Sequence, residues 1–408
     1  MWLFYDTIEK NTKGFAMKKC IYAVVVFVAA MLMGCGQKEE VDSDVFVEPE
    51  TMESQIASEE FSGEGSAEDV VEEGDMIIID REVVEGKKQS YLTGEWKDED
   101  VVDRRNMAVM MPNNKASLPQ YGISQASIIY EAPVEGRVTR LMCFLEDYDE
   151  LDHIGPVRSS RDYYVYEAMA YDSIYCNWGL ARPFVEELIN SDRIDNVSQP
   201  VAGIYNGVAD AFGRIERAGY ATEYTGYMYI DGYKKAVEKL EYEEDYRDTF
   251  VQAFTFANDG YPAKYEDCED ATMIIPGGKE KNRGGFWDAQ SYFEYDEEDG
   301  LYYRYQFGGE HIDEMNGEQL SCSNVVFKIC HGEVREPADM DYLAFGVHGT
   351  GNAYVFTAGK VIKGTWERTS DEAPNMFYDE DGNEIIFNQG KTWICCIWKE
   401  YSDYIYFE

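Results

Sequence analysis

The chain has 408 residues, and its 79 Asp and Glu against 36 Lys and Arg give a formal net charge of −43 at pH 7. So acidic a chain excludes nucleic acid as a partner, because phosphate contacts require clustered Lys and Arg. Nine cysteines at irregular spacing include no CxxC pair, so the sequence predicts no metal site and no other cofactor.

A lipoprotein signal lies near the start of the chain. Met17-Lys18-Lys19 precedes an apolar run from Ile21 to Met33, and Leu32-Met33-Gly34-Cys35 fits the site at which a lipoprotein signal peptidase cuts before the cysteine. A transmembrane helix is the alternative, but a run of about 13 residues is too short to cross about 30 Å of hydrocarbon. We therefore expect palmitate on Cys35 and a mature protein anchored on the extracytoplasmic face of the cell membrane.

An acidic segment follows the signal. Residues 38–75 contain 15 Asp or Glu against one Lys, with scattered Gly and Ser. This composition is typical of a disordered, self-repelling tether. From about Lys88 onward the composition becomes globular and aromatic, and the remaining length suffices for two ordinary domains.

The first half of the globular part alternates strand and helix patterns. Strands are predicted at 107–111, 127–130, 137–144 and 173–178, and a helix at 163–171. Another helix is predicted to open at Pro183, a residue suited to the first helical position. This alternation indicates an α/β architecture.

The second half has a different pattern. After a helix predicted at 233–240, hairpin and turn signals recur at Asp299-Gly300, Gly308-Gly309, Gly349-Thr350-Gly351 and Asp381-Gly382. They indicate a β-rich part. The acidic run 379–382 lacks the alternating ligands of a calcium loop, so a hairpin turn is the simpler interpretation.

The predicted organisation is an α/β N-terminal domain plus a β-rich (α+β) C-terminal domain, after a signal peptide and a disordered acidic tether. The expected segments are an over-extended start at 1–16, the signal peptide at 17–34, the lipidated cysteine and linker at 35–88, the α/β domain at 89–232, a helical connector at 233–270 and the β-rich domain at 271–408. The cysteines beyond Cys35 are interpreted as small buried hydrophobes rather than a disulfide frame, with Cys395 and Cys396 on opposite faces of a strand.

Charged residues of both signs crowd into 131–162. The candidate ligand-binding residues are Glu131, Glu135, Arg137, Arg140, Arg158, Ser159 and Arg161. We expect Ser159 to cap a helix, with Asp162 as its capping-box partner. A helix N-terminus between two arginines favours a carboxylate or phosphate ligand. Alternatively, Arg158 and Arg161 pair with Glu131 and Glu135 in a structural ion-pair network.

Several segments carry a family resemblance. The stretch 127–140, which reads SIIYEAPVEGRVTR, is followed by IGPVRSSR at 154–161; LTG at 92–94, GKVIKGTW at 359–366 and GKTWI at 390–394 extend the match over nearly all of 90–398. These segments strongly resemble the YerB-like lipoprotein family of bacteria. The resemblance implies a lipid-anchored, extracytoplasmic protein in two parts, from a family without an established activity.

Two functions of different class fit the sequence. One is a lipoprotein that binds an anionic or glycan envelope ligand through the arginine and glutamate cluster. The other is a cell-wall glycan hydrolase or transferase with Glu131 and Glu135 as acid and base, which requires two carboxylates about 5–9.5 Å apart across a pocket.

Overall fold

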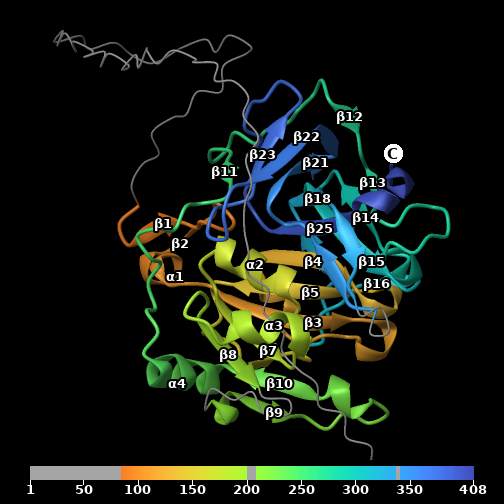
Figure 1. Ribbon diagram of the computed structural model, residues 1–408. Coiled ribbons are helices and arrows are strands. Elements are labelled where there is room, and N and C mark those ends of the chain that lie inside the picture. Colours follow the sequence, from red (N-terminus) through yellow and green to blue (C-terminus); the bar gives the residue numbers. More distant parts are fainter. Residues whose placement is uncertain (1–83, 200–207, 337–340) are drawn as a thin grey trace, which may run out of the picture. The chain divides into compact units, whose positions relative to one another are not determined.

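The computed structural model describes residues 84–199, 208–336 and 341–408, all within a unit from Gly74 to Glu408. The predicted signal peptide, the predicted lipidation site Cys35 and the predicted tether as far as residue 83 lie outside the described residues. In the described part an α/β N-terminal half precedes a β-rich C-terminal half (Figure 1), which confirms the predicted fold class.

One mixed sheet of 11 strands forms the centre of the fold, in the order β12-β22-β21-β18-β25-β4-β5-β3-β7-β8, with β23 paired to β22. The N-terminal half supplies β3 (Met107–Asn113), β4 (Ile128–Val134), β5 (Val138–Leu145), β7 (Ile174–Trp178) and β8 (Asn196–Gln199). The C-terminal half supplies β12 (Glu269–Asp270), β18 (Asn324–Cys330), β21 (Gly349–Thr357), β22 (Lys360–Arg368), β23 (Met376–Asp379) and β25 (Thr392–Trp398).

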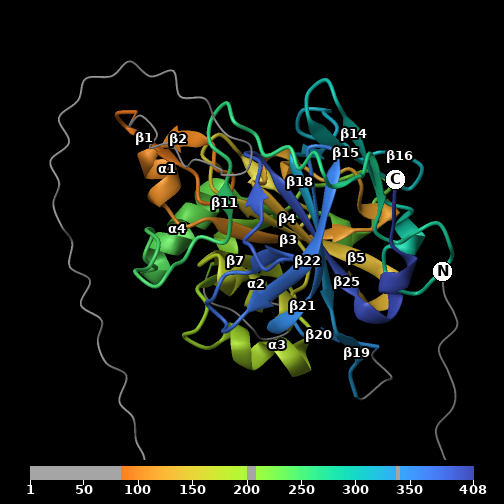
Figure 2. The same ribbon diagram turned by 90° about the horizontal axis from the view of Figure 1, so that it is seen from above.

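The two halves of the chain meet inside this sheet. Strand β25 runs parallel to β4, in a register that pairs Thr392 with Ile128 and Cys395 with Glu131. On its other side β25 runs parallel to β18. Strands from opposite ends of the sequence therefore lie side by side at the centre of the fold (Figures 1 and 2).

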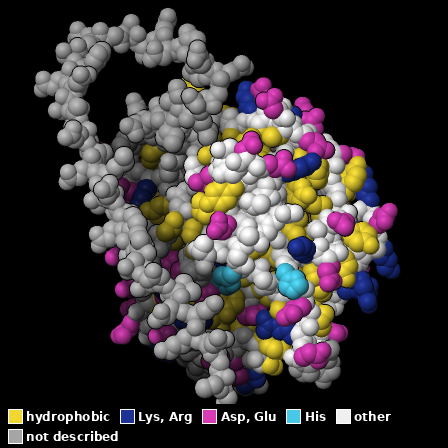
Figure 3. All heavy atoms as spheres, turned by 45° about the horizontal axis from the view of Figure 1, so that its top comes forward, with side chains coloured by type: hydrophobic (Ala, Val, Ile, Leu, Met, Phe, Trp, Pro, Cys, Tyr) yellow, Lys and Arg dark blue, Asp and Glu magenta, His cyan; other side chains and the backbone are white. Residues whose placement is uncertain are grey.

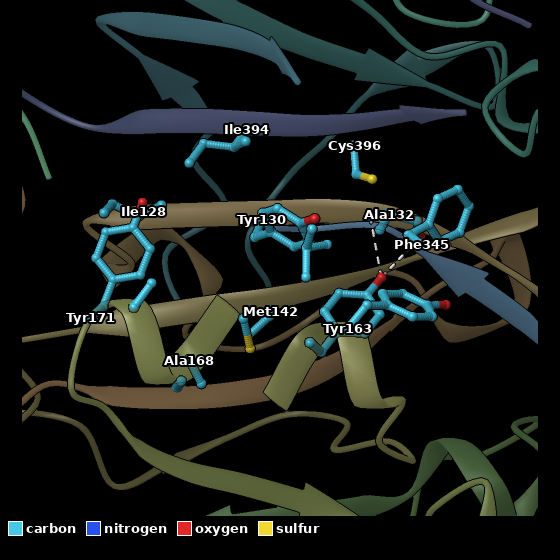
Figure 4. Packing of buried hydrophobic residues seen from close by; sticks show 14 of the residues in the cluster. Ile128, Tyr130, Ala132, Met142, Tyr163, Ala168, Tyr171, Phe345, Ile394 and Cys396 are labelled. Carbon is cyan, nitrogen blue, oxygen red and sulfur yellow. Dashed lines mark hydrogen bonds between the residues drawn. The ribbon is translucent and has the colours of Figure 1, made fainter. Parts of the chain in front are cut away.

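Both faces of the central sheet are covered. All seven residues of β3, β4, β18 and β25 are buried, which is why these strands are largely apolar. Glu131 in β4 and Lys328 in β18 are charged exceptions. Successive residues of these strands belong to two different hydrophobic clusters. Cys395 lies in one cluster and Cys396 in the other, as expected for opposite faces of a strand. Figure 4 shows one cluster, in which Tyr130 and Met142 of the sheet lie near Tyr163 of α2 (Asp162–Ala170).

The helices are few and short. Helix α1 (Glu99–Asp103) is followed by α2 and by α3 (Arg182–Ile189), which has the predicted proline in its first turn. Helix α4 (Ile230–Leu240) ends where Glu241 adopts a left-handed conformation. The connector predicted over 233–270 is therefore helical only to Leu240. Among the helices of the described ranges, none combines the length and the apolar character needed to cross a membrane.

A second sheet of six strands belongs to the C-terminal half, in the order β16-β15-β14-β13-β26, with β17 paired to β15. Its strands are β13 (Met273–Ile275), β14 (Tyr292–Asp296), β15 (Leu301–Gln306), β16 (Gly309–Glu310), β17 (Ser321–Cys322) and β26 (Tyr406–Phe407). The remaining strands form small sheets: β1 (Lys87–Gln89) with β2 (Trp96–Asp98), β6 (His153–Ile154) with β10 (Gly226–Tyr229) and β9 (Phe212–Arg214), β11 (Thr255–Phe256) with β24 (Ile386–Phe387), and β19 (Gly332–Val334) with β20 (Leu343–Phe345).

The turn predictions are confirmed in part. Asp299-Gly300 joins β14 to β15, and Gly308-Gly309 leads from β15 into β16. The turn predicted at 349–351 is wrong, because these residues begin β21 and the hairpin turns at Ala358-Gly359, where both φ angles are positive. A Cβ on Gly351 would lie 2.6 Å from the indole Nε1 of Trp366. Gly351 therefore allows the Trp366 ring to pack closely against the backbone of β21.

Acidic side chains are scattered over the face of the molecule in Figure 3, with basic and apolar side chains between them. The negative charge on this face is therefore spread out. To bind an anionic ligand, so acidic a chain needs a local group of positively charged side chains.

Candidate functional site

The segment 157–161 lies between the carboxyl ends of two parallel strands. The backbone N–H of Arg158 donates to Met110 of β3 at 2.8 Å, and the carbonyl of Arg158 accepts from Trp178 of β7 at 3.0 Å. The N–H of Ser160 donates to Gly179 at 2.8 Å. These bonds fix the segment at the edge where ligands of open α/β sheets usually bind.

The capping prediction for this segment is wrong. Helix α2 begins at Asp162 with Arg161 as its N-cap residue, and no side chain caps it. The Ser159 hydroxyl donates instead to the carbonyl of Trp178 at 3.3 Å, and the Asp162 carboxylate pairs with Arg335. The helix begins at Asp162, one residue before the predicted 163, and Ser159 cannot cap it because the backbone of 158–160 is engaged with the two strands.

Arg161 and Glu135 form a nearly closed ion pair. The Arg161 Nε lies 2.9 Å and 3.1 Å from the two carboxylate oxygens, and Nη2 also donates to Oε2. The side chains are 9% and 18% exposed. Burial alone would raise the pKa of Glu135, but the hydrogen bonds and charge of Arg161 outweigh it and hold that pKa below its ordinary value. The structure thus brings Arg161 and Glu135 together as an ion pair, as the structural alternative predicted.

Arg140 is different, because it has no acidic partner among the described residues. It lies on β5 and is only 7% exposed. Its one hydrogen bond runs from Nη1 to the carbonyl of Ser159. Burial first, and then the positive charges of Arg161 and Arg158, lower the pKa of Arg140 to about 10. The fold thus holds a nearly buried cation that forms no ion pair among the described residues, although its charge also helps to lower the pKa of the nearby Glu135.

Arg158 lies at the outer side of the same group. Its guanidinium is 23% exposed and contacts the carboxylate of Glu223 at 3.3 Å, and it lies 5.5 Å from the ring centre of Tyr224. Its Nε is buried and finds no acceptor in the part of the chain that the structure describes. The pair with a half-exposed glutamate is weak, so Arg158 keeps hydrogen-bonding capacity.

Glu131 lies in another environment. It is fully buried and accepts four hydrogen bonds, at 2.6 to 3.0 Å, from the side chains of Asn113, Thr139, Arg304 and Trp393. Glu135 lies beyond the end of the same strand and faces α2. The two carboxylates do not share a pocket, so this geometry does not support their use as acid and base on one glycan substrate.

Arg137 is separated from the other arginines. It lies in the turn between β4 and β5 with a left-handed φ of 61°, and it is 47% exposed. Its contact with Asp288 is long, at 3.7 Å. Together with Glu135 it lines a groove of about 320 Å³. The predicted cluster therefore divides into a buried group around Arg140 and an exposed groove.

A second group of buried charges escaped the sequence reasoning. Lys328 of β18 is fully buried and donates to Glu167 of α2 and to Asn375, both at 2.6 Å. Arg368 lies 3.7 Å from the same glutamate. The available signal was a lysine inside an otherwise apolar strand, since a charge buried on both faces of a sheet requires a buried partner.

Comparison with known proteins places this fold in a family. Residues 92–243 match the family model described as "Protein of unknown function (DUF3048) N-terminal domain", and residues 284–394 match the model of its C-terminal domain. The chain belongs to the DUF3048 family. The two matches fall on the α/β half and the β-rich half of the structure.

A curated relative and a solved structure agree with this assignment. The chain is 25% identical over 318 residues to "Putative lipoprotein YerB" of Bacillus subtilis (strain 168), which covers 76% of this chain and 86% of that protein. A crystal structure of the YerB protein from Bacillus subtilis matches with a TM-score of 0.63 at 22% identity, over 79% of this chain and 100% of that one. The resemblance predicted from the sequence is confirmed, and the structural match shows the fold.

Proposed function

We propose that this DUF3048 protein is a lipid-anchored envelope protein that binds an anionic ligand, through a carboxylate or phosphate group, at Arg140, Arg158 and Ser159. Two observations support the anchor. The YerB relative is described as a lipoprotein, and this chain carries the lipobox that ends at Cys35. The protein would then work on the extracytoplasmic face of the cell membrane.

The observation that carries the anion site is the buried charge of Arg140, which forms no ion pair among the described residues. Its side chain is 7% exposed and pairs with no acid among the described residues. A buried charge without a partner is costly, so an anion that reaches it supplies the missing charge. Arg158 lies close enough for its charge to act on Arg140. An anion between the two guanidinium groups would offset their mutual repulsion and accept hydrogen bonds from their N–H groups.

Isothermal titration of the purified protein with inorganic phosphate tests the anion site. We expect saturable binding by the wild type, and an affinity at least about tenfold weaker for Arg140→Met, which corresponds to about 1.4 kcal/mol. Lys115→Met is the matched control, because Lys115 is exposed on a neighbouring segment. If Arg140→Met binds phosphate as the wild type does, the proposed site is wrong.

Metabolic labelling with palmitate tests the anchor. The wild type should incorporate the label and sediment with membranes, whereas Cys35→Ala should do neither. Equal labelling of the two proteins would reject Cys35 as the lipidation site and leave the anion site untouched.

A further inference from the structure

The groove beside the turn between β4 and β5 is formed by distant parts of the chain. Its volume of about 320 Å³ lies within the range of about 300–1,000 Å³ that is usual for small-molecule sites. Its lining includes Pro133, Glu135, Arg137, Arg283, Trp398 and Tyr401. The family description and the relatives' names assign nothing to these residues.

One side of the groove is aromatic. The rings of Trp398 and Tyr401 lie 5.3 Å apart at an interplanar angle of 77°. Trp398 ends β25 and is only 9% exposed, whereas Tyr401 lies in the 3-10 helix Lys399–Tyr404 that follows and is partly exposed. The buried Trp398 therefore supports the ring of Tyr401, which is the one open to the groove. Aromatic rings held in this way offer apolar surface to a flat ligand at little entropic cost.

The groove is lined by two arginines and two acids, and one of the acids is already paired outside the lining. Arg137 is 47% exposed, and its nearest acid, Asp288, is 3.7 Å away. Arg283 is exposed and has no ion pair within the described ranges. Glu135 is already engaged by Arg161, which leaves Asp341 as the other acid of the lining. Once Glu135 is paired with Arg161, the lining sets two arginines against the single acid Asp341, in a chain of net charge −43, and this favours an anionic ligand over a cationic one.

The loop that carries Arg283 packs closely against Pro133 at the side of the groove. The Asn282 amide donates to the carbonyls of Gly277 and Glu280, at 2.7 Å and 3.0 Å, and accepts from the next glycine. Gly285 has a φ of 100°, and a Cβ there would lie 2.7 Å from the Cβ of Pro133. A side chain at Gly285 would therefore push the loop away from the groove.

We propose that this groove binds an acidic oligosaccharide. The apolar face of a sugar ring would pack on the partly exposed Tyr401, which the buried Trp398 supports, and its acidic groups would be held by Arg137 and Arg283. Neither arginine belongs to the anion site at Arg140, so this inference does not rest on the proposed function.

Titration calorimetry with three probes tests the groove. The probes are tetragalacturonate, which has rings and carboxylates, chitotetraose, which has neutral rings, and inorganic phosphate, which has charge alone. We expect tetragalacturonate to bind the wild type at least about tenfold more tightly than chitotetraose, and the double variant Arg137→Gln/Arg283→Gln to lose about tenfold or more of that affinity. Tyr401→Ala should weaken both oligosaccharides. The matched control is Lys281→Gln, which removes one exposed positive charge from the same loop, outside the lining.

Three results would overturn the inference. They are failure of tetragalacturonate to bind the wild type, equal affinities for the acidic and neutral oligosaccharides, and wild-type binding by the double variant. If Arg140→Met loses tetragalacturonate while the double variant retains it, the third result also places the acidic ligand at the Arg140 site. Loss in the double variant with unchanged phosphate binding supports two separate sites.

Discussion

Replacing Arg140 by methionine should make the unliganded protein more stable, which is the opposite of what removing Arg161 should do. Both arginines are nearly buried and lie in the same region of the fold. They differ in their partners. Arg161 neutralises Glu135, whereas Arg140 donates to one backbone carbonyl and forms no ion pair among the described residues.

The magnitude follows from the pKa of Arg140. Burial and the neighbouring arginines lower that pKa to about 10, against about 12.5 for a free arginine, and each pKa unit corresponds to about 1.4 kcal/mol. The charged form therefore destabilises the fold by about 3 kcal/mol. Methionine keeps much of the apolar stem and loses one hydrogen bond, worth about 1 kcal/mol. The expected net gain in the free energy of unfolding is about 2 kcal/mol.

Arg161→Met should instead cost about 3 kcal/mol, the low end of the range for a broken buried pair, because Glu135 remains 18% exposed. Urea unfolding followed by tryptophan fluorescence measures both variants, with an unchanged slope as the sign that the denatured state is the same. Lys115→Met controls for loss of a surface charge and should stay within about 0.5 kcal/mol of the wild type. A loss of more than about 1 kcal/mol in Arg140→Met would refute the reasoning, because it would mean that Arg140 has a stabilising partner.

Three further predictions concern other buried groups. Glu131→Gln should lower the free energy of unfolding by about 3–5 kcal/mol in urea titrations, because it leaves the fully buried Arg304 without its acid; a loss below about 1 kcal/mol would contradict this. The folded-state pKa of Glu135 lies below its ordinary value of 4.5, so the ion pair with Arg161 stabilises the fold above that pH and its contribution disappears as the pH falls through the lowered pKa. The stability difference between wild type and Glu135→Gln should therefore be larger at pH 7 than at pH 3, and an equal difference would contradict this assignment. Among the cysteines of the described residues, Cys268 is the one that is not fully buried, so iodoacetamide followed by peptide mapping should modify it first in the native folded part, and slowly, because burial raises its pKa.

Much of the N-terminal half could be predicted from the sequence. Strands buried on both faces read as apolar runs, which is why 107–111 and 127–130 were recognised, although both extend further in the structure. Pro183 marked a helix start because it needs no backbone donor there. The prediction of a turn at 349–351 was wrong because the sequence does not distinguish a glycine required for close packing, such as Gly351, from one required for a turn.

The sequence by itself determined the lipobox pattern, the acidic charge, the family and the elements whose periodicity is local. Only the tertiary structure decided which arginines are paired. Glu131 and Glu135 are four positions apart, yet one is buried against Arg304, 173 residues away in sequence, and the other meets Arg161 beyond the end of the strand. The physical reason is that a charge takes its partner from whatever the packed sheet brings within a few ångström, and that sheet joins β4 to β25 from the far end of the chain.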